Sequence, residues 1–167
     1  MARVKLETYF RTGLDLYKSG KFREARKLFN EILRIKPGHK ESILMTGQSY
    51  YQERKYDEAI RVYERALAKN PLELDFLLQK GITQIKLSHL QEAKTTFNIL
   101  IEKVPEDQKV LFHAARVMKE LGHSEEAIKS YKKLLEINPN HLQALNNLGN
   151  LYQQCELYND ALTVLLV

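Results

Sequence analysis

Cysteine is almost absent from this chain. Cys155 is the only one among 167 residues, so an internal disulfide and a cysteine-rich zinc site are both excluded. A single cysteine is compatible with a reducing compartment. Within a helix it is more often a small buried hydrophobic residue than a reactive thiol.

Long apolar stretches are missing as well. No run approaches the roughly 18 residues that span a bilayer, and residues 1–5 do not lead into the apolar core of a signal peptide. Apolar residues make up 44% of the chain and charged residues 28%, which is typical of a soluble globular protein. We therefore predict a soluble, intracellular and cytoplasmic chain, which is either whole or a fragment of a longer protein.

Motifs that carry chemistry are also missing. The sequence contains no glycine-rich phosphate loop, no nucleophile elbow, and no paired carboxylates with an accompanying base at a characteristic spacing. The acidic pairs Asp57-Glu58 and Glu125-Glu126 begin predicted helices, where carboxylates complement the helix dipole. We predict that the chain is not an enzyme and binds no cofactor.

Proline is scarce, and its few positions are informative. The prolines stand 34 residues apart, at Pro37, Pro71, Pro105 and Pro139. The same step relates the alanines Ala25, Ala59, Ala93, Ala127 and Ala161. It also relates Gly13, Gly47, Gly81 and Gly149, with Ala115 in the one remaining slot. A fixed period of this length indicates a repeat architecture.

Each repeat contains two amphipathic helices. Between residues 40 and 73, apolar residues recur at three- and four-residue steps in two series, which is the spacing of a helix face. The break at Arg54-Lys55 predicts a tight turn, and Asn70-Pro71 ends the second helix because proline disfavours helical geometry at the residue before it. Gly20 and Gly122, in two equivalent turns, suit a left-handed helix stop. This phase predicts first helices, called A, at 6–19, 40–53, 74–87, 108–121 and 142–155, and second helices, called B, at 22–35, 56–69, 90–103, 124–137 and 158–167.

Small and bulky residues have distinct places in this pattern. Gly47, Ala59 and their equivalents are expected where helices A and B approach most closely, since a larger side chain there would cost about 1–3 kcal/mol. Bulky residues are expected to fill the space toward the next repeat, at Phe29, Tyr63, Phe97 and Tyr131. Each repeat would then bury its face against its neighbours in a one-dimensional stack.

These features together resemble a known family. A 34-residue helix-turn-helix unit with a large residue at position 4, glycine or alanine at 8, an aromatic residue near 11, alanine at 20, an aromatic residue at 24 and proline at 32 resembles the tetratricopeptide repeat. The resemblance divides the chain into repeats at 6–39, 40–73, 74–107, 108–141 and the incomplete 142–167. It implies an all-α fold, a right-handed α-solenoid of antiparallel helix-turn-helix repeats in a single array over residues 1–167. The chain departs from the family pattern at three positions. No repeat has tryptophan at position 4, Gln84 replaces the aromatic residue near position 11 of the third repeat, and large residues replace alanine at position 27.

The phases of the histidines argue against a metal site. His39 and His141 share the last position of the repeat, and His89 and His123 share the A-to-B turn. Only His113 is expected to point toward a surface shared between repeats, and it has no cysteine or carboxylate at ligand spacing. We predict no bound metal.

The resemblance places function on a concave surface lined by the A helices. The candidate partner-binding residues are Phe10, Arg11, Leu14, Leu44, Met45, Gln48, Leu78, Gln79, Ile82, Phe112, His113, Arg116, Asn147 and Asn150. We predict that they bind an extended or helical protein segment through apolar anchors, with its backbone held by the amides of Asn147 and Asn150. The alternative is that residues at position 5, such as Leu44, Leu78 and Phe112, only pack adjacent A helices.

One kind of partner is excluded by the same comparison. Family members that bind the acidic tails of cytosolic chaperones use a clamp of lysine, asparagine and arginine side chains on this surface. In this chain the corresponding positions hold Phe10, Leu14, Met45, Asp75 and Gln79. The carboxylate clamp is therefore absent.

Positive charge concentrates in the first repeat. The net charge is +5, and residues 1–39 contribute ten basic and four acidic side chains, a balance of +6. A local cluster of Lys18, Lys21, Arg23, Arg26 and Lys27 could attract an acidic partner or nucleic acid. The alternative, which we favour, is a solvated helix face.

Three functions follow from the sequence. The leading one is a non-catalytic scaffold or adaptor that binds protein partners. The second is a regulatory or substrate-presenting arm of a larger enzyme, since the chain is similar to arrays attached to some glycosyltransferases, and the third is nucleic-acid binding through the basic first repeat. The apolar stretch 161–167 has no polar cap, which predicts self-association or further repeats at this end.

Overall fold

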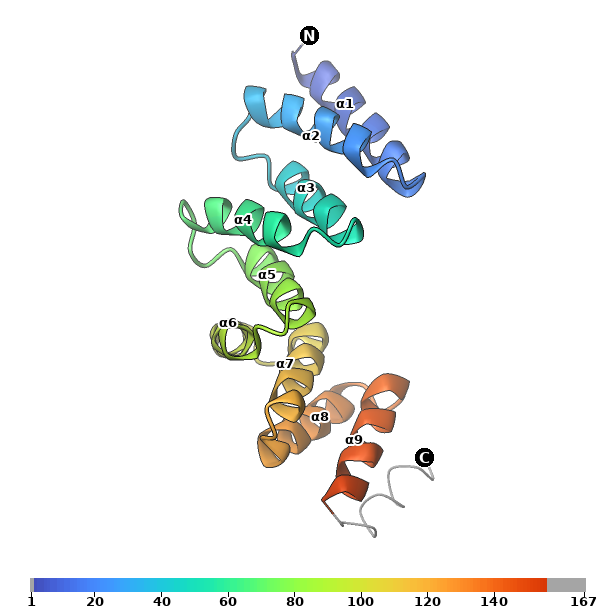
Figure 1. Ribbon diagram of the computed structural model, residues 1–167, viewed down its shortest axis with the longest axis vertical. Coiled ribbons are helices and arrows are strands. Elements are labelled where there is room, and N and C mark those ends of the chain that lie inside the picture. Colours follow the sequence, from blue (N-terminus) through green and yellow to red (C-terminus); the bar gives the residue numbers. More distant parts are fainter. Residues whose placement is uncertain (1, 156–167) are drawn as a thin grey trace. The chain divides into compact units, whose positions relative to one another are not determined.

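The computed structural model describes residues 2–155, and in these residues all regular secondary structure is α-helical (Figure 1). The helices are α1 (Ala2–Lys18), α2 (Phe22–Ile35), α3 (Lys40–Gln52), α4 (Tyr56–Leu67), α5 (Leu74–Lys86), α6 (Leu90–Lys103), α7 (Gln108–Glu120), α8 (Ser124–Ile137) and α9 (Leu142–Gln154). The predicted all-α fold class is confirmed. Helix α1 begins four residues earlier than predicted, because no proline or glycine interrupts the residues before Leu6. The predicted helix 158–167 and the apolar stretch 161–167 lie outside the described residues.

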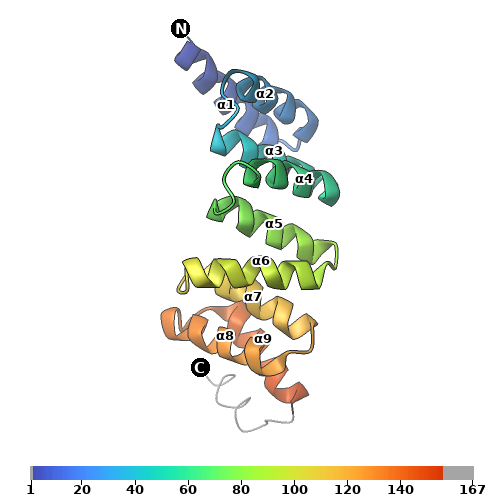
Figure 2. The same cartoon turned by 90° about the vertical axis from the view of Figure 1, so that its left-hand side faces the viewer.

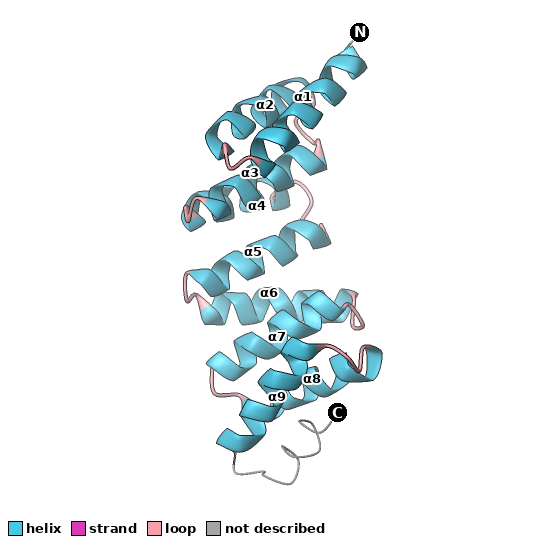
Figure 3. Cartoon of the chain, turned by 90° about the vertical axis from the view of Figure 1, so that its right-hand side faces the viewer, coloured by secondary structure: helices cyan, strands magenta, loops and turns pink. Residues whose placement is uncertain are grey.

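The described chain divides into two compact units. Unit 1 comprises residues 2–88 with helices α1 to α5, and unit 2 comprises residues 89–155 with helices α6 to α9. In unit 1, α1 packs against α2 and α3 against α4, as Figure 2 shows. In unit 2, α8 packs against both α7 and α9, and short loops join the helices (Figure 3). The prediction of a single array over residues 1–167 stays a prediction.

The aromatic residue at position 24 explains the glycine at position 8. Tyr63 is 1% exposed and Phe29 is fully buried. A methyl group built on Gly13 would lie 2.6 Å from the Phe29 ring, and one built on Gly47 would collide with the ring of Tyr63. The small residue therefore makes room for a ring from helix B of its own repeat. These rings also reach the next A helix, because the cluster around Phe29 includes Met45 of α3.

The A-to-B turns share a left-handed residue. Gly20 and Gly122 have φ values of 75° and 78°, which confirms the predicted helix stops. Arg54 and Ser88 occupy the equivalent positions with φ values of 60° and 58°. Residues other than glycine rarely adopt this backbone conformation. Because Arg54 and Ser88 adopt it, the packing of the helix pair imposes the turn geometry, and glycine is not required for it.

A buried ion pair joins the first two repeats of unit 1. Arg26 on α2 is 7% exposed, and its Nη2 donates to Glu53 Oε2 at the end of α3 across 2.8 Å. Its guanidinium carbon lies 4.1 Å from the centre of the Tyr50 ring, a cation–π contact. Burial would raise the pKa of Glu53, but hydrogen bonds from Lys55 and Arg26 outweigh burial and hold this pKa below its ordinary value.

We expect Gly47→Val to destabilise unit 1 by about 2 kcal/mol, because the added branches overpack against the Tyr63 ring. Urea unfolding followed by circular dichroism measures this loss. The control is Gly38→Ala, since a methyl group there meets no atom within 4 Å and Gly38 lies in a loop. Equal stability of the two variants would contradict the packing role of Gly47.

We expect Glu53→Gln to destabilise the protein by about 2 kcal/mol at neutral pH, because the substitution leaves the Arg26 guanidinium without its buried counter-charge. A carboxylate with a lowered folded pKa stabilises fully above its unfolded value of about 4.3, and this stabilisation disappears as the pH falls through the lower folded value. The difference between wild type and Glu53→Gln should therefore be constant from about pH 6 to 8 and shrink below about pH 4. Urea unfolding at each pH gives the result.

The exposed Glu58→Gln is the matched control for this experiment. Glu58 lies in the first turn of α4, and its removal should cost under about 1 kcal/mol. A Glu53→Gln loss no larger than the Glu58→Gln loss would show that the ion pair does not stabilise the fold.

Candidate functional site

The predicted partner-binding residues all reach the surface. Arg11 and Asn150 are exposed, and the other candidates are half-buried. In unit 1 they lie on α1, α3 and α5, and contacts of α3 with both α1 and α5 place these A helices side by side. The candidates of unit 2 lie on α7 and α9.

In the first two repeats, part of the candidate surface also belongs to the core. Phe10, Leu14 and Met45 pack around the buried ring of Phe29. The rings of Phe10 and Phe29 are 5.8 Å apart. Leu44, Leu78 and Ile82 are half-buried as well, and they are not among the residues of that cluster.

Phenylalanine at position 5 supports a histidine helix cap. The ring of Phe10 lies 5.6 Å from that of His39, and the ring of Phe112 lies 5.3 Å from that of His141. His39 Nδ1 accepts a hydrogen bond from the backbone N–H of Ser42 at the start of α3. His141 Nδ1 accepts one from the N–H of Ala144 at the start of α9. The contacts of Phe10 and Phe112 therefore agree with the packing alternative for position 5.

Sequence reasoning missed this aromatic and capping pair, although a signal was present. Phenylalanine at position 5 occurs in the same two repeats as histidine at position 34. Where position 5 is leucine, position 34 is an acid, Glu73 or Asp107. Asp107 caps α7 by accepting from the N–H of Val110 across 2.9 Å.

In unit 2, polar groups surround the candidate residues. Asn147 Oδ1 accepts from Lys119 Nζ across 3.4 Å, which links α9 to α7. Arg116 lies 3.6 Å from Glu120 one turn along α7. Asn147 is half-buried and Asn150 is exposed, so Asn150 is the more accessible of the two amides.

His113 is a neutral residue packed among aromatic rings. Its ring stacks on Phe97 at 6.0 Å and meets Phe112 at 5.5 Å. Burial, reinforced by the positive charges of Arg116 and Lys109, lowers the pKa of His113 to about 4. Its Nδ1 is buried and has no hydrogen-bond partner among the described residues. Within residues 2–155, no group of three or more histidine, cysteine, aspartate or glutamate side chains is arranged to hold a metal ion.

The basic cluster of the first repeat is not a uniform solvated face. Lys18, Lys21, Arg23 and Lys27 are exposed, but Arg26 is buried in its ion pair with Glu53. The inclusion of Arg26 among surface charges was therefore wrong, because its partners come from the next repeat. This observation removes one of the five charges on which nucleic-acid binding depended.

Asp75 occupies a position where chaperone-binding family members have a clamp residue, and in this chain it forms an ion pair with Lys40. Lys40 forms ion pairs with both Asp75 and Glu73. Hydrogen bonds to Asp75 and Glu73 raise the pKa of Lys40 above its ordinary value. This network fixes the start of α3 to the start of α5.

In the described part of the chain, no helix has the length and apolar character needed to cross a membrane.

Comparison with solved structures gives the fold. MamA from Desulfovibrio magneticus RS-1, from residue 41 to its end, superposes with a TM-score of 0.87 at 17% identity, over 96% of this chain and 91% of that one. Another crystal structure of MamA gives 0.84 at 19% identity, over 99% and 90%. A tetratricopeptide repeat protein from Parabacteroides merdae gives 0.83 at 19% identity, over 96% of this chain and 64% of that chain. These likenesses concern the fold alone. No curated protein sequence matches the chain.

Sequence models of one family match most of the chain. Two models described as tetratricopeptide repeat match residues 10–73 and 50–116. A third, described as TPR repeat, matches residues 115–154. Together the three matches cover residues 10–154, and the chain belongs to the tetratricopeptide repeat family.

Proposed function

We propose that this chain is a non-catalytic scaffold that binds a segment of a partner protein on its A-helix face. The observation that carries the proposal is the row of half-buried apolar side chains Leu44, Leu78 and Ile82 on α3 and α5. These side chains lie on adjacent helices of unit 1 and retain surface for a partner to cover. Burying apolar side chains of this kind contributes about 25 cal/mol per Å².

Polar neighbours of these side chains would align the partner backbone. Gln48 and Gln79 are half-buried beside the apolar row, and an amide both donates and accepts hydrogen bonds. In unit 2, Asn147 and Asn150 supply the same chemistry on α9. We infer an extended or helical partner segment with apolar anchors.

The test is capture of partners by the full chain from a lysate, quantified by mass spectrometry. We expect the double variant Leu44→Glu, Ile82→Glu to lose about tenfold or more of each specific partner, because a buried carboxylate without a counter-charge opposes binding. Phe112 is left unchanged, since it supports the His141 cap and its loss would disturb the fold.

The matched control is the double variant Ile137→Glu, Leu142→Glu. It introduces the same charge at two exposed apolar side chains, 39% and 73% exposed, away from the A-helix candidates. Circular dichroism must show unchanged helicity in both variants. Full capture by a folded Leu44→Glu, Ile82→Glu variant, or equal losses in both variants, would refute binding at this face.

A further inference from the structure

Unit 1 contains a pocket that lies away from the A-helix candidates. The pocket has a volume of about 620 Å³ and is formed by α2, α3, α4 and the start of α5. On α3 it uses Lys40, Ile43 and Thr46, whereas the partner-binding candidates on α3 are Leu44, Met45 and Gln48. At 3.6 residues per turn the centres of these two sets lie about 150° apart around α3, and only Lys40 and Leu44, one turn apart, are neighbours. The pocket is therefore a separate site, and it does not depend on the proposed function.

The floor of the pocket is apolar. Leu33 of α2, Ile43 of α3 and Val62 of α4 are half-buried along it, and Phe76 of α5 is 5% exposed. Its volume lies within the range of about 300–1,000 Å³ that is usual for pockets that enclose a ligand. An occupant therefore needs an apolar group to cover this floor.

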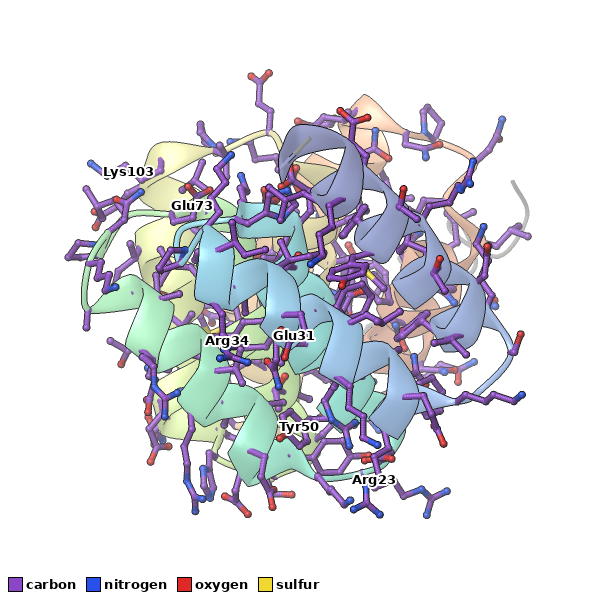
Figure 4. All side chains as sticks on the ribbon, turned by 90° about the horizontal axis from the view of Figure 1, so that it is seen from above. Arg23, Glu31, Arg34, Tyr50, Glu73 and Lys103 are labelled. Atoms are coloured by element: carbon purple, nitrogen blue, oxygen red, sulfur yellow. The ribbon has the colours of Figure 1, made fainter. Side chains whose placement is uncertain are left out.

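The rim of the pocket is basic, and part of its charge is already neutralised. Arg34 contacts Glu31 on the same helix, and the two side chains lie together in Figure 4. Lys40 is held by Glu73 and Asp75.

Two other cations on the rim have no ion-pair partner among the described residues. Arg65 and Lys69 are exposed and form no ion pair with another described residue. Arg65 lies in the last turn of α4 and Lys69 in the turn that follows this helix, so both charges stand on the rim where α4 ends.

An unsatisfied hydroxyl lies in the wall of the same pocket. Thr46 is 4% exposed, and its Oγ1 is buried without a hydrogen-bond partner among the described residues. Buried hydroxyl groups nearly always have a partner, and leaving one without a partner is costly. Because this oxygen is itself covered by protein atoms, it offers no hydrogen bond to an occupant of the pocket.

We propose that this pocket binds a short acidic segment of a partner protein, with two carboxylates on Arg65 and Lys69 and an apolar side chain on the floor. A single small anion would use one cation and leave the floor uncovered. In an extended peptide, alternate side chains point to the same side and lie about 6.5–7 Å apart. Two carboxylates at alternate positions can therefore face Arg65 and Lys69 together. Two acidic residues at alternate positions, followed by an apolar residue two positions further, satisfy both parts of the pocket.

The test uses the full chain labelled with ¹⁵N and a capped peptide with the order glutamate, serine, glutamate, serine, leucine. We expect amide shifts to change at Thr46, Val62 and Ala66, and the dissociation constant to rise about tenfold or more in Arg65→Glu. The matched control is Arg61→Glu, which changes the same charge on the same helix at an exposed residue outside the pocket. The control should bind as wild type does.

Peptide variants separate the two contributions to binding. Replacing both glutamates by glutamine, or the leucine by serine, should each weaken binding about tenfold or more. Equal binding by Arg65→Glu and Arg61→Glu, shift changes on Leu44 and Ile82 instead of the pocket, or no binding of the peptide at millimolar concentration would overturn the proposal.

Other occupants are distinguished in the same experiment. Shift changes at the pocket with octanoate but not with the peptide would identify a site for a lipid-like anion, and the proposal would be wrong. Sedimentation of the chain without peptide is the second arm. A dimer that Arg65→Glu dissociates and Arg61→Glu does not would identify a second copy of the chain as the occupant, which also overturns the proposal.

Discussion

The fold depends on a ring from helix B that lies against a small residue on helix A of the same repeat. A buried aromatic side chain removes about 150–250 Å² from water, which corresponds to about 4–6 kcal/mol. Phe29 and Tyr63 obtain this burial only because Gly13 and Gly47 offer no side chain. The contact fixes which face of each A helix is turned inward. The remaining faces, and hence every candidate binding surface, follow from it.

The sequence identifies both members of this contact because each repeats in phase, but it does not pair them. Phe29 and Tyr63 were expected to fill the space toward the next repeat, and they also lie against Gly13 and Gly47 of their own repeats. The helix bounds agree with the 34-residue pattern to within a few residues, and the left-handed turns at Gly20 and Gly122 follow from their glycines. The same turn at Arg54 has no local signal, because packing of the helix pair imposes it. The prediction that Arg26 belongs to an exposed basic cluster was wrong for a related reason. The burial of Arg26 depends on Glu53 and Tyr50 of the next repeat. The residue pattern within one repeat does not indicate that Glu53, 27 positions further along, is the ion-pair partner of Arg26.

The family pattern is enough to place the candidate surface on the A helices. It does not predict which of the candidate residues pack against capping histidines and which do not. The rings of Phe10 and Phe112 lie against the histidines that cap the next A helix, whereas Leu44 and Leu78 occupy the same position in the second and third repeats. The contacts of position 5 therefore differ between repeats. An aromatic residue there favours stacking on the capping imidazole. Leucine cannot stack in this way, and both leucines are half-buried.

The pocket of unit 1 shows how an array with one backbone pattern acquires a local site. Sixty-eight positions further along, which is two repeats, Thr46 corresponds to Ala114 and Lys69 to Ile137. The unsatisfied hydroxyl and one of the two free cations are thus absent from the equivalent place in unit 2, although Arg65 has a basic counterpart in Lys133. The in-phase residues that pack the helices are retained, since Ala127 and Tyr131 are fully buried there as Ala59 and Tyr63 nearly are in unit 1. Arg65 and Lys69 are exposed, so packing leaves their positions free to differ between repeats, whereas Thr46 and Ala114 are both buried and must fit among packed helices.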